Sequence, residues 1–299
     1  MITVMTHMDS DGVISLALFL KKIKGLKVRA YFTSPVQLRD TICRSTLRKK
    51  SLGELYIFDL AGENKAVYAA AIYDRVLWID HHEWSPEENF DHVEIVIDSR
   101  AKSAASVVAK HLEVESPLVH FADQIDTNSV TDENAEKIRI TVGAIRYRYS
   151  GYELTRKLLD LAYELSQEDL STLDKYRDIV EEYRTWMEKI KREAKEKTKI
   201  YHVKNLKVAI FETTESVPVY LLSNELDGDV DIFAIMIYRV VNDGKKPITK
   251  LEFRTHTDVD VLKIAKFYGG GGHKKASGAS VSGVITVPEL LKAIELLYS

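Results

Sequence analysis

The chain has 299 residues, of which 45% are hydrophobic and 29% charged, so it is long enough for two domains and can bury a core without disulfides. A formal net charge of -3 excludes a protein that coats long DNA through a broad basic face. The single cysteine, Cys43, has no partner for an internal disulfide, and the sequence shows neither a secretory signal pattern nor eighteen consecutive apolar residues. We therefore expect a cytoplasmic protein that does not associate with membranes.

The first part of the chain alternates short apolar segments with helical stretches. The predicted strands cover residues 2–6, 28–32, 55–59, 76–80, 93–98 and 118–122. This alternation is typical of a doubly wound α/β domain with a mainly parallel sheet. Asp59, Asp80 and Asp123 each lie at or just after the end of an apolar segment. Since ligands bind beyond the carboxyl ends of the strands in such sheets, we expect the three carboxylates in one crevice.

A helical middle section follows. Helices are expected over residues 132–149, 152–165 and about 167–199. The third carries apolar residues spaced alternately by three and four positions, which are Leu173, Tyr176, Val180, Tyr183, Met187, Ile190 and Ala194. We interpret it as a connecting helix that packs on its own domains, and a coiled coil in a homodimer is the alternative.

The last third of the chain predicts a smaller α/β domain. Strands are expected over residues 206–212, 232–239 and 251–255, and helices near 218–225, 258–267 and 287–297. The expected organisation is thus a domain at 1–165, a linker helix at 166–199 and a second domain at 200–299.

The first acidic motif is His7-Met8-Asp9-Ser10-Asp11-Gly12, directly after the first predicted strand. Alternating positions of an extended segment point to one side, so His7, Asp9 and Asp11 can converge on metal ions. We expect Gly12 to free the backbone for a helix that begins near residue 13. The simpler explanation, a polar helix start with Asp11 or Ser10 as the cap, does not require three ligands in register.

A second motif, Asp80-His81-His82, follows four apolar residues. Polar groups at the end of a buried strand need partners, so a solvated strand end explains the motif less well. Carboxylates mixed with imidazoles suit Mn²⁺, Fe²⁺ or Zn²⁺ better than Ca²⁺, and the two motifs supply more ligands than one ion needs. We interpret them as a two-metal hydrolytic site.

Four successive glycines, residues 269–272, precede His273 and two lysines. A flexible turn is the default explanation for such a run. Backbone N–H groups of glycines can also wrap an anion, and lysines add charge, so we favour contact with phosphate. Arg254, at the end of a predicted strand, is a second candidate for phosphate binding.

In this order and spacing, the motifs resemble the DHH phosphoesterase superfamily, in particular members with the DHH-associated, glycine-rich C-terminal domain. The resemblance covers His7 to Gly12, Asp59, Asp80 to His82 and the glycine run. One residue separates His7 from Asp9, which is similar to RecJ-type and archaeal members, whereas oligoribonuclease-like members have three.

The resemblance implies a pair of Mn²⁺ ions, with Mg²⁺ or Co²⁺ as alternatives. The implied ligands are His7, Asp9, Asp11, Asp59, His81 and an aspartate of a fourth motif, which we assign to Asp123 with Asp126 as the alternative. Asp80 is implied to orient a histidine, and His82 to face the phosphate. Arg254, Gly270, Gly271, Gly272 and His273 are implied to bind the rest of the substrate.

The resulting hypothesis is a metal-dependent phosphodiesterase that hydrolyses short single-stranded oligonucleotides, RNA in preference to DNA, to mononucleotides in an interdomain cleft. Alternatives within the class are a RecJ-like exonuclease, a linear or cyclic dinucleotide phosphodiesterase and a 3′-phosphoadenosine 5′-phosphate phosphatase. A non-catalytic nucleic-acid-binding scaffold is the alternative from a different class.

Overall fold

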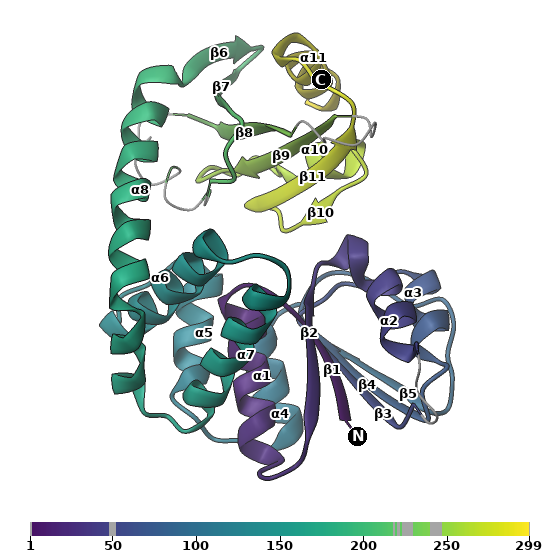
Figure 1. Cartoon of the computed structure of the whole chain (residues 1–299). Coiled ribbons are helices and arrows are strands. Elements are labelled where there is room, and N and C mark those ends of the chain that lie inside the picture. The colour runs from purple at the N-terminus through teal and green to yellow at the C-terminus, as the bar shows by residue number, and fades with distance from the viewer. Residues whose placement is uncertain are drawn as a thin grey trace. The chain divides into compact units, whose positions relative to one another are not determined.

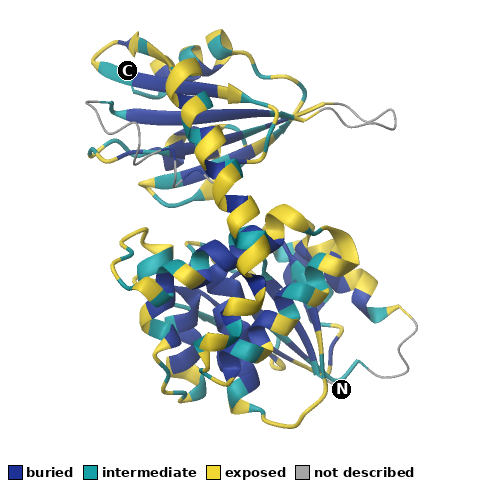
Figure 2. Cartoon of the chain, turned by 60° about the vertical axis from the view of Figure 1, so that its left-hand side comes forward, coloured by how far each residue is buried: buried dark blue, intermediate teal, exposed yellow. Residues whose placement is uncertain are grey.

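The computed structural model describes residues 2–47, 52–217, 219, 222, 230–239 and 247–298. The chain divides into two compact units, Met1–Tyr183 and Arg184–Ser299 (Figure 1). Buried residues lie along the strands of both units and on the faces of the helices that cover them (Figure 2). Most of the helix expected over residues 218–225 lies outside the described residues. Among the described residues, no helix has the length and apolar character needed to span a membrane.

The first unit contains a five-stranded, fully parallel sheet in the order β2-β1-β3-β4-β5. Its strands are β1 (Ile2–His7), β2 (Val28–Thr33), β3 (Glu54–Phe58), β4 (Arg75–Asp80) and β5 (Val93–Ile97). The prediction of these five strands is confirmed. Because β1 lies between β2 and β3, the strand order reverses there, and the carboxyl ends of β1 and β3 flank the position where doubly wound sheets bind ligands.

Helices cover both faces of this sheet (Figure 1). One face carries α1 (Ser10–Lys22), α4 (Ala104–Leu112), α5 (Leu118–Asp126), α6 (Glu133–Arg148) and α7 (Gly151–Ser166). The other carries α2 (Leu38–Thr46), which follows the short η1 (Pro35–Gln37), and α3 (Asn64–Ala70). Neighbouring strand residues alternate between the two cores, as Val4 and Met5 do, so the strands are apolar on both sides.

One predicted strand is wrong. Residues 118–122 form the start of helix α5. The buried residues of that helix are Leu118, Phe121 and Ala122, a spacing of three and four that fits one helical face. A five-residue apolar run fits either structure, and its position after α4 gives it no neighbouring strand to pair with in the described sheet.

The third predicted helix is present as a 3₁₀ segment, η2 (Leu170–Tyr176), followed by α8 (Arg177–Lys197). All of its predicted apolar residues are buried except Val180, which is half-buried. Leu173 and Tyr176 join the core of the first unit, whereas Ile190 and Ala194 join a core of the second. The helix therefore packs on its own chain, as expected, and the boundary between the units falls within it.

The second unit is built on a six-stranded mixed sheet in the order β10-β11-β9-β8-β7-β6, in which only β7 and β8 pair in parallel. Its elements are β6 (Lys199–Val203), β7 (Leu206–Thr213), β8 (Ile232–Arg239), β9 (Ile248–Arg254), α10 (Leu262–Phe267), β10 (Gly271–Gly272), β11 (Ala276–Ser282) and α11 (Val287–Leu297). Strands β6, β10 and β11 were not expected. The overall class, a doubly wound domain with a smaller α/β domain after a helix, is confirmed.

Candidate active site

The first acidic motif lies where β1 passes into α1. His7 is the last residue of β1, and Asp9 caps α1 by accepting a hydrogen bond from the Gly12 amide at 3.1 Å. Helix α1 begins at Ser10, three residues earlier than expected. A Cβ on Gly12 would lie 2.3 Å from the His7 carbonyl oxygen. Gly12 is thus needed because the first turn of α1 approaches the end of β1 closely, rather than for a special backbone angle.

A first group of ligand atoms is formed by His7, Asp9 and Asp59. His7 Nδ1 lies 2.6 Å from Asp9 Oδ2 and 3.6 Å from Asp59 Oδ2. Burial by itself opposes ionisation of Asp9, yet the adjacent His7 imidazole and the Gly12 amide lower the pKa of this carboxyl. Asp9 is therefore an anion that is available to a cation at neutral pH.

A second group consists of Asp11, His81 and Asp126. His81 Nε2 lies 3.7 Å from Asp11 Oδ2 and 3.6 Å from Asp126 Oδ2. The other ring nitrogen, Nδ1, donates to the Ala101 carbonyl at 3.4 Å, which directs Nε2 toward the carboxylates. Both Asp11 oxygens accept backbone amides at the start of α4, from Ala104 at 2.6 Å and Ala105 at 2.9 Å.

Asp59 lies between the two groups. Its Oδ2 faces His7, and its Oδ1 lies 3.8 Å from His81 Nε2. The residue directly follows β3 and adopts a left-handed backbone, with a φ of 55°, which is unusual for a residue other than glycine. Such strain persists only where the surroundings enforce it, and it is common at functional sites. One carboxylate is thus held where it can serve both groups.

The charges of this region fit divalent cations. Burial, together with the charges of Asp9 and Asp11, raises the pKa of Asp59 well above its usual value. Burial and the charge of Asp126 raise the pKa of Asp11 to about 8. Asp59 Oδ2 is buried and accepts no hydrogen bond from any described residue. Bound cations stabilise buried carboxylates that repel one another, and above all an oxygen without a donor such as Asp59 Oδ2, so the residues present suit a metal centre.

Asp80 and His82 form a separate pair beside these groups. Asp80 ends β4 and is fully buried. Its Oδ1 lies 2.8 Å from His82 Nδ1, and its Oδ2 accepts the Trp84 indole N–H at 2.7 Å. Burial by itself would lower the pKa of His82, but the bond to Asp80 and the charge of that carboxylate raise it to about 9. His82 is therefore a cation held beside the acidic groups.

The structure does not place Asp123 with the clustered carboxylates. Because residues 118–122 are helical, Asp123 lies within α5, where its Oδ1 accepts hydrogen bonds from the Ser103 hydroxyl at 2.6 Å and the Ser106 hydroxyl at 2.5 Å. Asp126, one helical turn later, faces His81 instead. The choice of Asp123 depended on a strand that is absent from the described sheet. The geometry favours the alternative, Asp126.

Part of the backbone of the glycine run in the second unit is hydrogen-bonded within the chain. The amides of Gly269, Gly270 and His273 donate to the carbonyls of Lys266, Ala265 and Ala276. These amides are thus occupied within the chain. Gly271 pairs with Gly278, and the alternation of an antiparallel ladder leaves the Gly272 amide pointing away from β11.

Packing explains two of these glycines. A Cβ on Gly270 would lie 2.1 Å from the Gly278 carbonyl oxygen, and one on Gly272 would lie 2.7 Å from that of Ala276. A Cβ on Gly271 would meet no atom within 4 Å, so that position faces open space.

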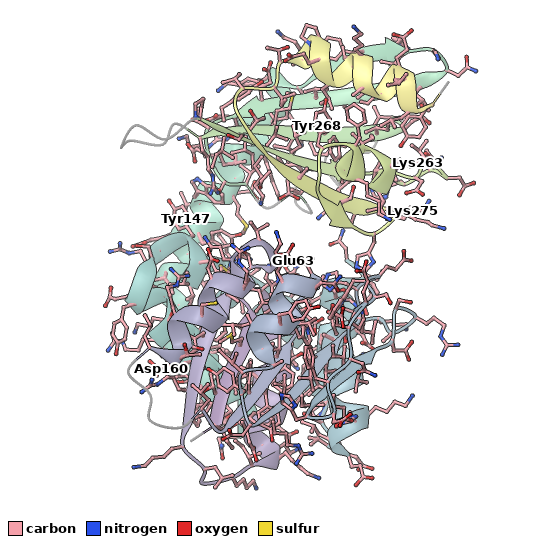
Figure 3. All side chains as sticks on the ribbon, turned by 90° about the vertical axis from the view of Figure 1, so that its right-hand side faces the viewer. Glu63, Tyr147, Asp160, Lys263, Tyr268 and Lys275 are labelled. Carbon is pink, nitrogen blue, oxygen red and sulfur yellow. The ribbon has the colours of Figure 1, made fainter. Side chains whose placement is uncertain are left out.

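Basic residues of the second unit, including Lys275 and Arg254, are the other candidates for phosphate contact. Lys274 and Lys275 lie in the turn that joins β10 to β11, where Figure 3 labels Lys275. Lys275 contacts the Thr257 carbonyl. Arg254, at the end of β9, pairs across the ladders with Phe233 and Ala276, and its Nη1 donates to the Phe253 carbonyl at 2.9 Å.

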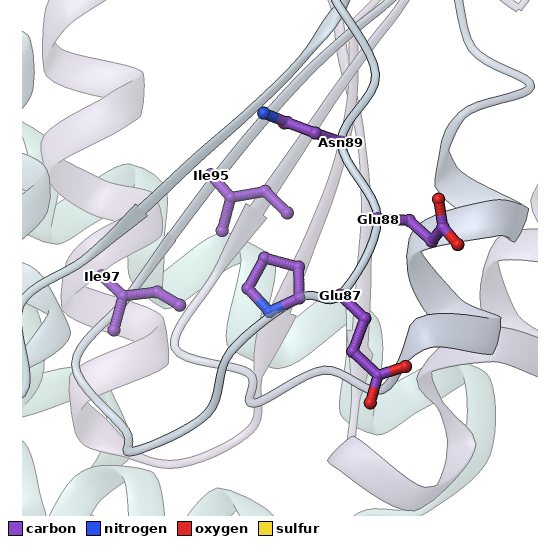
Figure 4. A pocket seen from close by; sticks show the side chains of 6 residues that line it. Glu87, Glu88, Asn89, Ile95 and Ile97 are labelled. Atoms are coloured by element: carbon purple, nitrogen blue, oxygen red, sulfur yellow. The ribbon is translucent and has the colours of Figure 1, made fainter.

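A pocket of about 530 Å³ lies elsewhere on the first unit (Figure 4). Its lining comes from the segment after His82 and from β5, namely Pro86, Glu87, Glu88, Asn89, Ile95 and Ile97. Its walls include none of the clustered carboxylates or imidazoles described above.

Two residues of this region escaped the sequence analysis in different ways. Asp126 was considered only as the second choice, and the helical spacing of Leu118, Phe121 and Ala122 was the signal that could have favoured it. Trp84 was not considered at all. Its position four residues after Asp80 carries no local signal, because the contact depends on how the loop after β4 folds back.

Comparison with protein families identifies residues 205–299 as a DHHA1 domain. No match was found among curated proteins. Among solved structures, the pGpG-specific phosphodiesterase PggH from Vibrio cholerae is similar, with a TM-score of 0.58 and 18% identity over 99% of this chain and 97% of that one.

Two further structures share the fold. An exopolyphosphatase-related protein from Bacteroides fragilis has a TM-score of 0.54 and 17% identity, over 99% of this chain and 90% of that one. The exonuclease RecJ bound to manganese has a TM-score of 0.55 and 13% identity, over 99% and 88%. The DHHA1 domain of the second unit and the fold shared with these structures support the resemblance of the ordered acidic motifs to the DHH phosphoesterase superfamily.

Proposed function

We propose that the chain is a metal-dependent phosphodiesterase that hydrolyses short single-stranded oligonucleotides, RNA in preference to DNA, to mononucleotides. The observation that carries this proposal is the pair of carboxylate and imidazole groups that share Asp59. A carboxylate between two such groups suits a two-ion site, and two-ion sites are typical of enzymes that cleave phosphate esters.

In this proposal, His7 and Asp9 would hold one ion, Asp11, His81 and Asp126 would hold the other, and Asp59 would be available to either. The mixture of carboxylates and imidazoles favours Mn²⁺, with Mg²⁺ and Co²⁺ as alternatives. When bound, two such ions activate a water molecule as the nucleophile and stabilise the charge that develops on the phosphate.

His82 has a role of its own. Its hydrogen bond with Asp80 fixes the ring orientation and places a proton on Nδ1. Since the pKa of His82 is raised to about 9, the ring is positively charged at neutral pH. We assign it to the substrate phosphate, where it neutralises charge and can supply a proton to the leaving oxygen.

The second unit is proposed to bind the remainder of the substrate through Arg254, Gly270, Gly271, Gly272 and His273. Support comes from the open space beside Gly271 and the outward Gly272 amide. A linear dinucleotide is the second candidate substrate. The similarity to a pGpG-specific phosphodiesterase, which extends over nearly the whole of both chains, favours it.

The test is product analysis with 5′-labelled RNA and DNA of graded length, starting from dinucleotides, in the presence of Mn²⁺. The expected result is metal-dependent release of mononucleotides, fastest for the shortest RNA and abolished by EDTA or by Asp59→Asn. Preference for the longest substrates would indicate a RecJ-like exonuclease. Absence of cleavage at every length, and of cyclic dinucleotides, would contradict the proposal and favour a nucleic-acid-binding scaffold.

A further inference from the structure

The Asp80 carboxylate is held by two donors from one short loop. His82 contacts its Oδ1 at 2.8 Å, and the Trp84 indole donates to its Oδ2 at 2.7 Å. Each oxygen of this fully buried carboxylate therefore has a partner of its own. The Trp84 bond prevents the carboxylate from rotating, because rotation would leave a buried oxygen without a donor.

The position of the Trp84 ring is fixed by packing. It lies 4.9 Å from the ring of Trp78, a fully buried residue of β4 whose indole donates to the Leu60 carbonyl at 2.8 Å. A Cβ on Gly62 would lie 2.6 Å from the Trp78 ring and 2.9 Å from the Trp84 ring. The two indoles thus connect the loop that follows β3, and carries Asp59, with the loop that follows β4.

We propose that Trp84 is a positioning residue of the active site, which acts through Asp80 on the orientation of the His82 ring. The role of His82 in this inference rests on the proposed function. The contact between Trp84 and Asp80 does not, and it can be tested without any substrate.

The expected kinetic consequence is specific. Without the indole N–H, the Asp80 carboxylate retains the hydrogen bond with His82 as its side-chain hydrogen bond among the described residues, and both groups gain rotational freedom. Because Trp84 orients a group that acts on the reacting phosphate, its loss weakens stabilisation of the transition state more than binding of the substrate. The catalytic rate constant should fall while the Michaelis constant changes little.

The first experiment compares Trp84→Phe with Trp186→Phe in the full-length chain. Trp186 is a matched control, because its indole also donates to a carboxylate, Glu215, at 2.7 Å, but within the second unit. Trp84→Phe should lower kcat roughly 10- to 100-fold with KM within about twofold, whereas Trp186→Phe should leave both constants unchanged. An unchanged kcat, or a raised KM alone, would overturn the inference.

A second variant tests the position of the Trp84 ring without removing any of its atoms, as Trp84→Phe does. Gly62→Ala removes no hydrogen-bonding group but displaces both indoles. It should reproduce the fall in kcat. A wild-type kcat in a folded Gly62→Ala protein would contradict the dependence of activity on the position of the Trp84 indole.

The third measurement is independent of activity. The chain has three tryptophans, so three indole N–H signals are expected in a nitrogen–proton correlation spectrum of the metal-free protein, and the two Trp→Phe variants assign them. Asp80→Asn should shift the Trp84 signal and not that of Trp186, and Trp84→Phe should shift the ring-nitrogen signals of His82. Unmoved signals would overturn the inference. If the wild type cleaves no substrate, the proposed function fails, while these spectra still decide whether Trp84 positions Asp80 and His82.

Discussion

The acidic strand ends of the first unit and the glycine run of the second are both conspicuous in the sequence, yet their polar groups differ. Around Asp59, buried carboxylates repel one another, and Asp59 Oδ2 has no hydrogen-bond donor among the described residues. In the glycine run, the amides of Gly269, Gly270 and His273 are bonded within the chain. Polar groups that a fold buries without partners indicate a missing ligand, whereas the bonded amides of the glycine run are structural and leave its open side, at Gly271 and the Gly272 amide, to a substrate.

The largest expected effect is that of Asp59→Asn. Activity with Mn²⁺ should fall roughly a thousandfold or more, because both proposed ion positions lose a charged ligand. The metal-free variant should unfold at a higher temperature than the wild type, since a buried charge that repels its neighbours has been removed. Activity assays and thermal unfolding in EDTA check the two effects. Loss of stability together with activity would indicate a structural role for Asp59.

Replacing each of the two candidate aspartates of α5 separately compares a carboxylate that faces the clustered acidic groups with one that is hydrogen-bonded within the fold. Asp126→Asn should lower activity by about 100-fold, because Asp126 faces His81. Asp123→Asn should lower it less than about fivefold and act mainly on stability, since Asp123 accepts two serine hydroxyls. Assays of the two variants under identical Mn²⁺ concentrations decide between them. The reverse ranking would restore Asp123 as the ligand.

A series of pH values tests whether ionisation of the buried Asp11 carboxyl destabilises the metal-free protein. The folded-state pKa of Asp11 is raised from 3.8 to about 8, so the stability linked to its protonated form is present below pH 4 and is lost as the pH rises to about 8. The free energy of unfolding of Asp11→Asn in EDTA, relative to the wild type, should therefore increase over this range. Denaturant unfolding at several pH values measures it. A difference in the free energy of unfolding that is constant with pH would show that the pKa of Asp11 is not raised in the folded protein.

The smallest effects concern the glycine run. Gly270→Ala should lower the free energy of unfolding by about 1–3 kcal/mol, because the added Cβ meets the Gly278 carbonyl. Gly271→Ala, which faces open space, should leave stability unchanged and raise KM if this position contacts substrate. Chemical denaturation and steady-state kinetics separate the two. Equal destabilisation by both variants would contradict the packing explanation for Gly270.

Much of this organisation could be predicted from the sequence, because buried parallel strands read as apolar runs and acidic residues follow them directly. The strand predicted at residues 118–122 is wrong, since a short apolar run fits a strand or a helical face, and the assignment of Asp123 rested on that strand. Strand β11 was missed because its alanines, glycine and serines have little strand propensity by themselves, and pairing with β9 forms it. The sequence does not show whether a glycine is needed for ligand binding or for close packing, because the packing partners lie elsewhere in the chain.

Helix α8 also bears on how the chain is made. The first unit covers Met1–Tyr183, and near its end Leu173 and Tyr176 help to fill its core. During synthesis, this unit can complete its core once the first turns of α8 have left the ribosome, before any strand of the second unit has emerged from it. The remaining turns, with Ile190 and Ala194, then offer the growing second sheet an apolar surface on which to assemble.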